Sequence, residues 1–256
     1  MSTAAIKHSP SPLGARFSLG LRIAASMFVL SIGALIMLCV AVATLFRCRH
    51  FYSERIAGPM GHLLLRIFAV RFVVHGAQPL PREQVVYISN HTSTIDMFVL
   101  IAMGLPNARF FLSGFLRKLL PLGLIGYLIG IFWTVPQAYP ERRRAIFMRA
   151  ARVLERSGES VYLSPEGERV TNGRIGHFNK GAFHLATALR APIVPMFIAI
   201  PRTIDPGKGL DARPGTVHVH VGAPIDTSSW RVDEVELNRD AMRRFYERWH
   251  QELGRS

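Results

Sequence analysis

The chain has 256 residues, 49% of them hydrophobic and 19% charged. This composition excludes an intrinsically disordered protein, and the length allows one sizeable domain with an anchor but not two full enzymatic domains. The net charge of +14 is compatible with nucleic acid, an anionic membrane surface or an acidic substrate or carrier protein. No zinc finger, heptad zipper or RNA-recognition signature is present, so we expect no nucleic-acid partner.

Residues 23–46 form a run of 24 uncharged residues between Arg22 and Arg47. This is long enough to span a bilayer as a helix and too long for the apolar core of a signal peptide. We therefore predict a transmembrane anchor over residues 21–47, after a disordered segment 1–20. Basic residues stand on both sides of the run, so the positive-inside rule barely discriminates between the two orientations. The two cysteines, Cys39 and Cys48, do not indicate a disulfide framework, which is compatible with a cytosolic catalytic domain.

A membrane-associated connector is expected over residues 48–80. Its apolar part, residues 59–75, is interrupted by Arg66 and Arg71. This pattern fits an amphipathic helix lying on the membrane with snorkelling arginines, and fits a packing helix equally well.

From residue 81 to residue 256 the pattern predicts a single domain of the α/β class, with a central sheet flanked by helices. The expected strands lie at 85–89, 109–112, 131–135, 160–164, 192–200 and 216–221. The expected helices lie at 96–104, 141–157, 180–190 and 232–253.

The stretch Leu119–Val135 is uncharged and contains three glycines and Pro121. We favour a buried or membrane-dipping segment near a bound apolar chain, and keep a second transmembrane helix as the alternative.

The first candidate site follows the strand 85–89. His91 stands where strand turns into helix, and Asp96 follows five residues later in the first helical turn. A carboxylate folded back on the imidazole would fix its tautomer and leave the other ring nitrogen free to accept a proton. Alternatively, Asp96 only stabilises the start of the helix. Ser93 lacks the sequence context of a nucleophilic serine.

The second candidate site is the stretch 164–182, which follows the strand 160–164. Glycines there allow close backbone approach, and cations such as Arg169 and Lys180 can hold an anionic headgroup. Lys180 at a helix start opposes the helix dipole, which suggests a bound anion. We expect Glu166 to order the loop by pairing with an arginine. The alternative is a solvated basic loop.

Four motifs now stand in order. They are N-H-x4-D at 90–96, P-E-G-x-R at 165–169, F-x-K-G-A at 178–182 and A-P-I-V-P at 191–195. Their order and spacing resemble the glycerolipid acyltransferase family typified by bacterial 1-acylglycerol-3-phosphate acyltransferase, over residues 80–225.

The resemblance implies a mixed sheet flanked by helices, with His91 as catalytic base and Asp96 as its partner. It further implies that Glu166, Gly167 and Arg169 bind the acceptor, and we add Lys180 to this set. The donor is expected to be acyl-CoA or acyl carrier protein, and the partner a membrane lipid, with no metal, no cofactor and no covalent acyl-enzyme. The expected location is the inner membrane, crossed once, with the catalytic domain on the cytoplasmic side.

The expected reaction is acylation of 1-acyl-sn-glycerol-3-phosphate to phosphatidic acid, with backbone N–H groups of the strand-to-helix turn stabilising the oxyanion. Two departures from the family pattern stand out. Glu168 replaces the usual threonine, and the strand 131–135 lacks the arginine that usually follows it. Arg142 to Arg144 are candidate substitutes, and a lyso-ornithine or other lyso-aminolipid acceptor is the alternative.

His218 and His220 alternate on one strand and so share a face. No third metal ligand stands at a suitable spacing, so we interpret them as solvent-facing histidines rather than a metal site.

Overall fold

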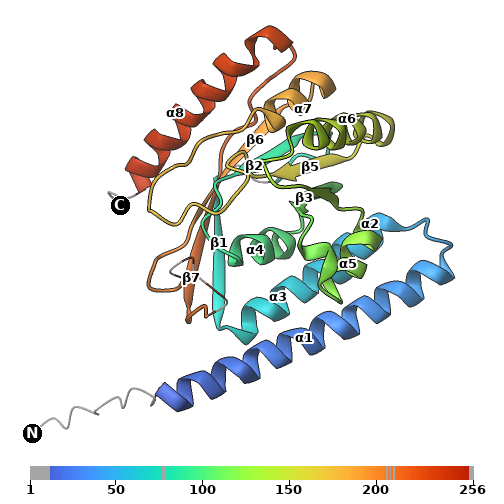
Figure 1. Ribbon diagram of the computed structural model, residues 1–256, viewed down its shortest axis with the longest axis vertical. Helices are drawn as coiled ribbons and strands as arrows, with labels where there is room; N and C mark the ends of the chain where they lie inside the picture. Colours follow the sequence, from blue (N-terminus) through green and yellow to red (C-terminus); the bar gives the residue numbers. More distant parts are fainter. Residues whose placement is uncertain (1–11, 77–78, 206, 208, 210, 254–256) are drawn as a thin grey trace, which may run out of the picture.

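A computed structural model describes residues 12–76, 79–205, 207, 209 and 211–253. Its centre is a seven-stranded sheet in the order β1-β7-β6-β2-β5-β3-β4 (Figure 1). The strands from β2 to β6 run parallel to one another, whereas β7 is antiparallel to β6 and β1 is parallel to β7. The strands are β1 Val70–Gly76, β2 Val86–Ser89, β3 Ala108–Ser113, β4 Phe132–Thr134, β5 Ser160–Leu163, β6 Ile193–Ala199 and β7 Gly215–Val221. The predicted α/β fold with a central mixed sheet flanked by helices is confirmed.

Helices cover both faces of the sheet (Figure 1). Residues alternate along β2, so that Tyr87 packs with α3 and α4 on one face, while Val86 and Ile88 pack with α6, α7 and α8 on the other. All four residues of β2 are buried, which is typical of a parallel strand covered on both faces. The helices are α1 Pro12–Ala43, α2 Arg49–Phe51, α3 Gly58–Ile67, α4 Ile95–Met103, α5 Leu122–Ile129, α6 Pro140–Ser157, α7 Gly181–Leu189 and α8 Val235–Leu253, with shorter helical turns at Tyr52–Ala57, Leu116–Lys118 and Val232–Glu234.

Helix α1 is the one helix in the described part of the chain that is long and apolar enough to cross a membrane. It begins at Pro12, so the prediction of disorder is wrong for residues 12–20, and residues 1–11 lie outside the described part. Proline at the first helical position sacrifices no intrahelical hydrogen bond, and the long apolar run that follows propagates the helix. One face of α1 packs on the domain through Leu30, Ala34, Met37 and Ala41.

The connector is not one amphipathic helix. Helix α3 ends at Ile67, and Val70–Gly76 is an edge strand with alternating burial. The arginines that interrupt the apolar run therefore belong to two different elements, one helical and one extended. Helix α3 contacts α1 and α4 through buried Leu64 and Leu65, as in the packing-helix alternative. At the start of the connector, Arg49 lies 3.9 Å from the buried carboxylate of Glu159.

The stretch Leu119–Val135 is divided between α5 and β4. Helix α5 has eight residues, about 12 Å at 1.5 Å per residue, so the alternative of a second transmembrane helix is wrong. Its buried side packs against α1 and α3, whereas its Tyr127, and Leu120 just before the helix, are exposed. The proline at 121 precedes this helix and the glycine at 130, with a φ of +77°, ends it, so the uncharged stretch does not form a long helix.

Candidate active site

The catalytic pair predicted from the sequence is brought together at the carboxyl end of β2. Strand β2 ends at Ser89 and α4 begins at Ile95, so the intervening turn carries His91 while Asp96 lies in the first turn of the helix. The Nδ1 atom of His91 lies 2.8 Å from Oδ2 of Asp96. Asp96 is 1% exposed, and the His91 side chain is 30% exposed. The remaining nitrogen, Nε2, is therefore the one available to a substrate.

Asp96 also shapes the turn itself. Its Oδ2 atom accepts hydrogen bonds from the backbone N–H groups of Thr92 at 2.8 Å and Ser93 at 3.0 Å. These bonds hold the carboxylate as an acceptor, so Nδ1 of His91 carries the proton that it donates to Asp96. This tautomer leaves a lone pair on Nε2, as a general base requires.

The expected oxyanion site in this turn is not supported. An oxyanion needs N–H groups that are free of other partners. Instead, the amides of the turn bond within the protein, to the carboxylates of Glu166 and Asp96 and to the hydroxyl of Ser93. The engaged donors are the N–H groups of His91, Thr92, Ser93 and Ile95. The prediction is wrong for these four groups.

Glu166 joins the two predicted sites. Its Oε2 atom accepts a 2.6 Å hydrogen bond from the N–H of His91, and its Oε1 atom accepts a 2.7 Å bond from the N–H of Gly176. The residue is 3% exposed, and burial raises the pKa of its carboxyl to about 7 against the opposing effect of these two bonds and the charge of His91. The expected pairing with an arginine is wrong, because backbone amides take its place.

Residues next to Glu166 in the loop after β5 also contact the turn that carries His91. Nη1 of Arg169 donates a 2.8 Å hydrogen bond to Oγ1 of Thr94, which places the guanidinium at the start of α4. The N–H of Val170 donates to the carbonyl oxygen of His91 at 2.8 Å. Gly167 has a φ of +73°, and a Cβ atom there would lie 2.8 Å from Nδ2 of Asn179, so both its conformation and its surroundings require glycine.

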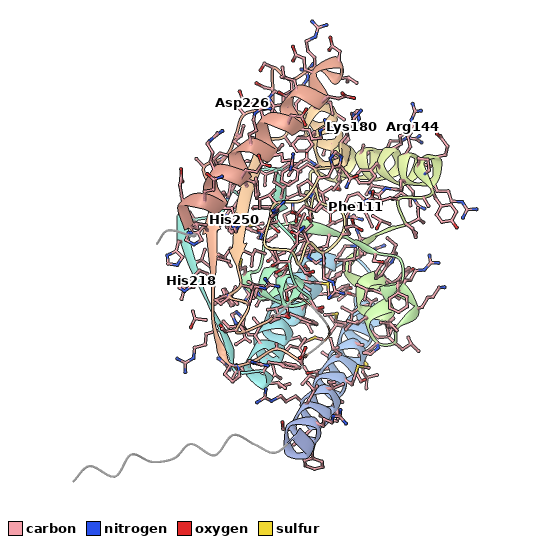
Figure 2. The ribbon with its side chains drawn as sticks, turned by 60° about the vertical axis from the view of Figure 1, so that its left-hand side comes forward. Phe111, Arg144, Lys180, His218, Asp226 and His250 are labelled. Carbon is pink, nitrogen blue, oxygen red and sulfur yellow. The ribbon has the colours of Figure 1, made fainter. Side chains whose placement is uncertain are left out.

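The environment of Lys180 differs from the predicted anion site. Its backbone caps the start of α7, and its ammonium pairs with the carboxylate of Glu236, which lies in α8. The charge that suggested a bound anion is therefore balanced by a residue from another helix. In Figure 2 Lys180 is labelled near Arg144 at the upper end of the molecule.

Two of the three arginines proposed as substitutes for the missing family arginine have other contacts. Nη1 of Arg143 donates to the carbonyl oxygen of Val135 at 3.0 Å, and the guanidinium of Arg142 lies 5.3 Å from the ring centre of Tyr139. Gln137 lies close to the loop after β5, since a Cβ atom on Gly167 would be 3.5 Å from its Nε2. A neutral amide from the segment after β4 thus approaches the loop after β5.

Asp205 is a residue of the site that sequence reasoning missed. It comes from the segment after β6, is 6% exposed, and accepts a hydrogen bond from the hydroxyl of Ser93. Its other oxygen accepts from the N–H of Gly207 at 2.7 Å. The hydroxyl of Ser93 is thereby buried and bonded, which argues against a nucleophilic role. No motif pointed to Asp205, because 112 residues separate it from Ser93.

Sequence reasoning also missed a third histidine beside His218 and His220. His75 on β1 lies with Nε2 2.9 Å from Nδ1 of His218, and its ring stacks on that of His220 at 4.7 Å. The strand β1 was not predicted, so this contact could not be foreseen. Within the described ranges, no group of three or more His, Cys, Asp or Glu residues could hold a metal ion.

An apolar cavity of about 40 Å³ lies beyond the first turn of α4. Met97 and Phe98, the two residues after Asp96, form part of its wall. The stretch expected to contact an apolar chain supplies several further wall residues, which are Leu122, Ile125, Gly126, Ile129, Ile131 and Trp133.

A mixed sheet flanked by helices, with an imidazole–carboxylate pair at the carboxyl end of a parallel strand, defines an α/β protein equipped for general base catalysis. The family model described as Acyltransferase matches residues 71–199, which is half of the chain, and the chain belongs to this family.

Two named relatives illustrate the sequence similarity. The 1-acyl-sn-glycerol-3-phosphate acyltransferase of Limnanthes douglasii is 27% identical over 192 residues, and the alpha form from Homo sapiens is 29% identical over 187 residues. Each alignment covers 69% of this chain and 62% of the relative. The chain therefore spans about three fifths of the length of the curated relatives that it matches.

The fold has a solved counterpart. The crystal structure of the 1-acyl-sn-glycerophosphate (LPA) acyltransferase PlsC from Thermotoga maritima superposes with a TM-score of 0.67. The match covers 89% of this chain and 96% of that chain at 19% sequence identity. At this identity the likeness confirms the fold alone.

Proposed function

We propose that this protein transfers a fatty acyl chain from acyl-CoA or acyl carrier protein to the hydroxyl of 1-acyl-sn-glycerol-3-phosphate, giving phosphatidic acid. The observation that carries the proposal is the contact between Nδ1 of His91 and the buried carboxylate of Asp96. Family membership and the names of the relatives support this acceptor. They do not favour the lyso-aminolipid alternative.

The proposed reaction follows from the ring nitrogen of His91 that has no partner in the catalytic pair, Nε2. Nε2 of His91 removes the proton from the acceptor hydroxyl as its oxygen attacks the thioester carbonyl carbon. The carboxylate of Asp96 stabilises the imidazolium that forms. As the carbon–sulfur bond breaks, the imidazolium returns its proton to the departing thiol, and the base is regenerated. Such catalysis contributes about 10²- to 10⁴-fold. Arg169, whose guanidinium donates a hydrogen bond to Thr94 beside the turn, would neutralise a phosphate there.

The apolar cavity would receive the acyl chain. Its volume of about 40 Å³ holds only a small part of such a chain, so side chains in the wall must move on binding. Methionine suits such a wall because its three rotatable bonds let it repack, and Met60 and Met97 are part of it.

A location at the inner membrane is part of the proposal, with α1 crossing once and the catalytic domain on the cytoplasmic side. Because α1 packs on α3 and α5, a membrane around its exposed face would also meet the surface of α5, where Tyr127 is exposed, and Leu120 just before that helix. Extraction of membranes with alkaline carbonate tests the anchor, and protease accessibility of the carboxyl terminus in intact spheroplasts tests the orientation. Release by carbonate, or cleavage from the outer side, would contradict this location.

The function is tested with the full chain purified in detergent. Labelled palmitoyl-CoA is supplied with 1-acyl-sn-glycerol-3-phosphate, with a lyso-ornithine lipid or with glycerol 3-phosphate, and the products are separated. We expect labelled phosphatidic acid from the first acceptor. His91→Ala should remove this product while thermal unfolding stays close to that of the unmodified protein. Near-normal activity of that variant, or product from another acceptor only, would overturn the proposal.

A further inference from the structure

Two cavities lie next to the segment that follows β2 and carries His91 and Asp96. In the order β1-β7-β6-β2-β5-β3-β4, β2 has β6 and β7 on one side and β5, β3 and β4 on the other. The apolar cavity lies on the β4 side, where Leu112 of β3 and Trp133 of β4 line it. A second cavity, which we call the β6 cavity, is lined by residues 197–202 at the end of β6 and by residues of the loop after β5 between positions 170 and 175.

The β6 cavity measures about 400 Å³ and reaches the catalytic turn. Asn90 and Thr92, the residues on either side of His91, both line it. Its volume is within the usual range of small-molecule sites, roughly 300–1,000 Å³. Residues next to His91 therefore line the larger cavity, and residues next to Asp96 line the small apolar one.

The chemistry of the β6 cavity differs from that of the apolar cavity. Apolar side chains form much of its wall, while its rim carries cationic or protonatable groups. These are Arg174, Arg202, His218 and His250. Figure 2 shows His218 and His250 on the same side of the molecule, on β7 and α8.

The two arginines of this rim have no ion-pair partner within the described residues. No carboxylate there forms an ion pair with Arg174 or Arg202, both of which are exposed. Asp205 also lines the cavity, but it is buried, its two oxygens accept hydrogen bonds from Ser93 and Gly207, and it forms no ion pair with either arginine. The cavity thus combines an apolar wall with a rim suited to an anion.

We propose that the β6 cavity binds the phosphopantetheine arm of the acyl donor, with its phosphate at Arg174 and Arg202. This inference rests on the proposed function, because it concerns the donor of that reaction. A thioester donor has an apolar chain on one side of its carbonyl and, on the other, an arm of amides and methyl groups that ends in a phosphate. With its carbonyl at Nε2 of His91, the donor would extend its chain into the apolar cavity and its arm into the β6 cavity.

The arm is common to acyl-CoA and acyl carrier protein, so the β6 cavity would serve either donor. The competing occupant is the acceptor, whose own phosphate could bind the same arginines. Substitutions of the rim arginines distinguish the donor from the acceptor. If the cavity binds the donor, these substitutions weaken binding of the phosphopantetheine arm; if it binds the acceptor, they do not.

The test compares Arg174→Gln, Arg202→Gln and the double variant with the unmodified full chain. The control is Arg152→Gln, which changes an exposed arginine on α6 away from the cavity. Each protein is assayed with palmitoyl-CoA, with palmitoyl carrier protein and with palmitoyl-N-acetylcysteamine, a thioester that lacks the phosphate. Calorimetry measures binding of 4′-phosphopantetheine and pantetheine without any acceptor.

We expect each rim variant to raise KM for palmitoyl-CoA about three- to tenfold, the loss of one exposed charge-assisted contact. KM for the acceptor and the rate with the short thioester should change less than twofold, as should all values of Arg152→Gln. An effect on palmitoyl-CoA without one on palmitoyl carrier protein would assign the rim to the nucleotide of CoA and overturn the proposal.

Binding should follow the same pattern. The unmodified protein should prefer 4′-phosphopantetheine to pantetheine, and the double variant should lose this preference. A rise in KM for the acceptor alone would place the acceptor phosphate at the rim instead. The unmodified protein could make no phosphatidic acid and still bind 4′-phosphopantetheine in a way that depends on the rim arginines. That result would refute the proposed acceptor but leave this inference standing.

Discussion

The carboxylate of Glu166 accepts the backbone N–H of His91 at 2.6 Å, so a residue from the loop after β5 fixes the turn after β2. Its second oxygen holds Gly176 further along the same loop. Both oxygens face N–H donors, and the residue is buried. Glu166 therefore acts as a positioning residue, which keeps the imidazole and the basic loop in one arrangement.

Glu166→Gln tests this positioning. The amide nitrogen of glutamine must face one of the two N–H donors, so one hydrogen bond is lost and the turn or the loop shifts. We expect kcat for phosphatidic acid synthesis to fall about 10- to 100-fold, the equivalent of one charged hydrogen bond of about 1.5–3 kcal/mol. The exposed Glu155 on α6 provides the matched control, Glu155→Gln. A value of kcat within twofold of the unmodified enzyme would show that the bond to His91 does not position the base.

The same carboxyl makes stability depend on pH. Burial raises its pKa from the ordinary 4.5 to about 7 in the folded protein. Between these values the folded protein keeps a proton that the unfolded chain has released. The contribution of Glu166 to the free energy of unfolding is therefore fully present below pH 4.5 and is lost as the pH rises through about 7.

Glutamine at position 166 removes this titration. Thermal unfolding followed from pH 4.5 to pH 8 should show a steeper loss of Tm in the unmodified protein than in Glu166→Gln. Parallel curves for the two proteins would mean that Glu166 does not carry the raised pKa.

The substitution Asp96→Asn removes the negative charge of residue 96 while keeping the shape of its side chain. The amide oxygen can still accept the N–H groups of Thr92 and Ser93, while the amide nitrogen takes the place of Oδ1, which has no hydrogen-bond partner. The turn should keep its form, but the imidazolium loses its counter-charge.

We expect Asp96→Asn to lower kcat about 10²- to 10⁴-fold with KM for both substrates changed little. Steady-state kinetics and circular dichroism, with His91→Ala for comparison, check this. A large rise in KM at normal kcat would instead assign Asp96 to substrate binding.

Local patterns predicted most of the fold. The strand β2 is a short apolar run and α6 has an apolar face, and both are signalled by residues close together in the chain. The strand β1 was missed because arginine at position 71 interrupts an apolar stretch, and its extended form depends on pairing with β7, in which Val70 lies opposite Gly215. That partner lies far along the chain and gives no local signal.

The same distinction applies to the site. His91 and Asp96 are five residues apart, so a single turn brings them together and the sequence pattern indicates the pair. The partners of Glu166 and Ser93 come from distant segments, and tertiary structure decides them. Charge at a helix start was a poor guide for Lys180, because the helix that carries Glu236 supplies the compensating charge.

Lys180→Met therefore tests whether this lysine serves the substrate or the fold. Its ammonium is paired with Glu236 in α8, and both side chains are exposed. Such exposed pairs contribute about 0–1 kcal/mol to stability. We expect KM for 1-acyl-sn-glycerol-3-phosphate and kcat to stay within about twofold, with a small decrease in Tm.

Glu236→Gln is the matched partner variant, because it removes the same ion pair and leaves the lysine charge in place. If the pair is structural, the two variants should lower Tm equally, and combining them should add nothing further. A large rise in KM for the acceptor in Lys180→Met, absent from Glu236→Gln, would show that the lysine holds the acceptor phosphate, as the sequence pattern had indicated.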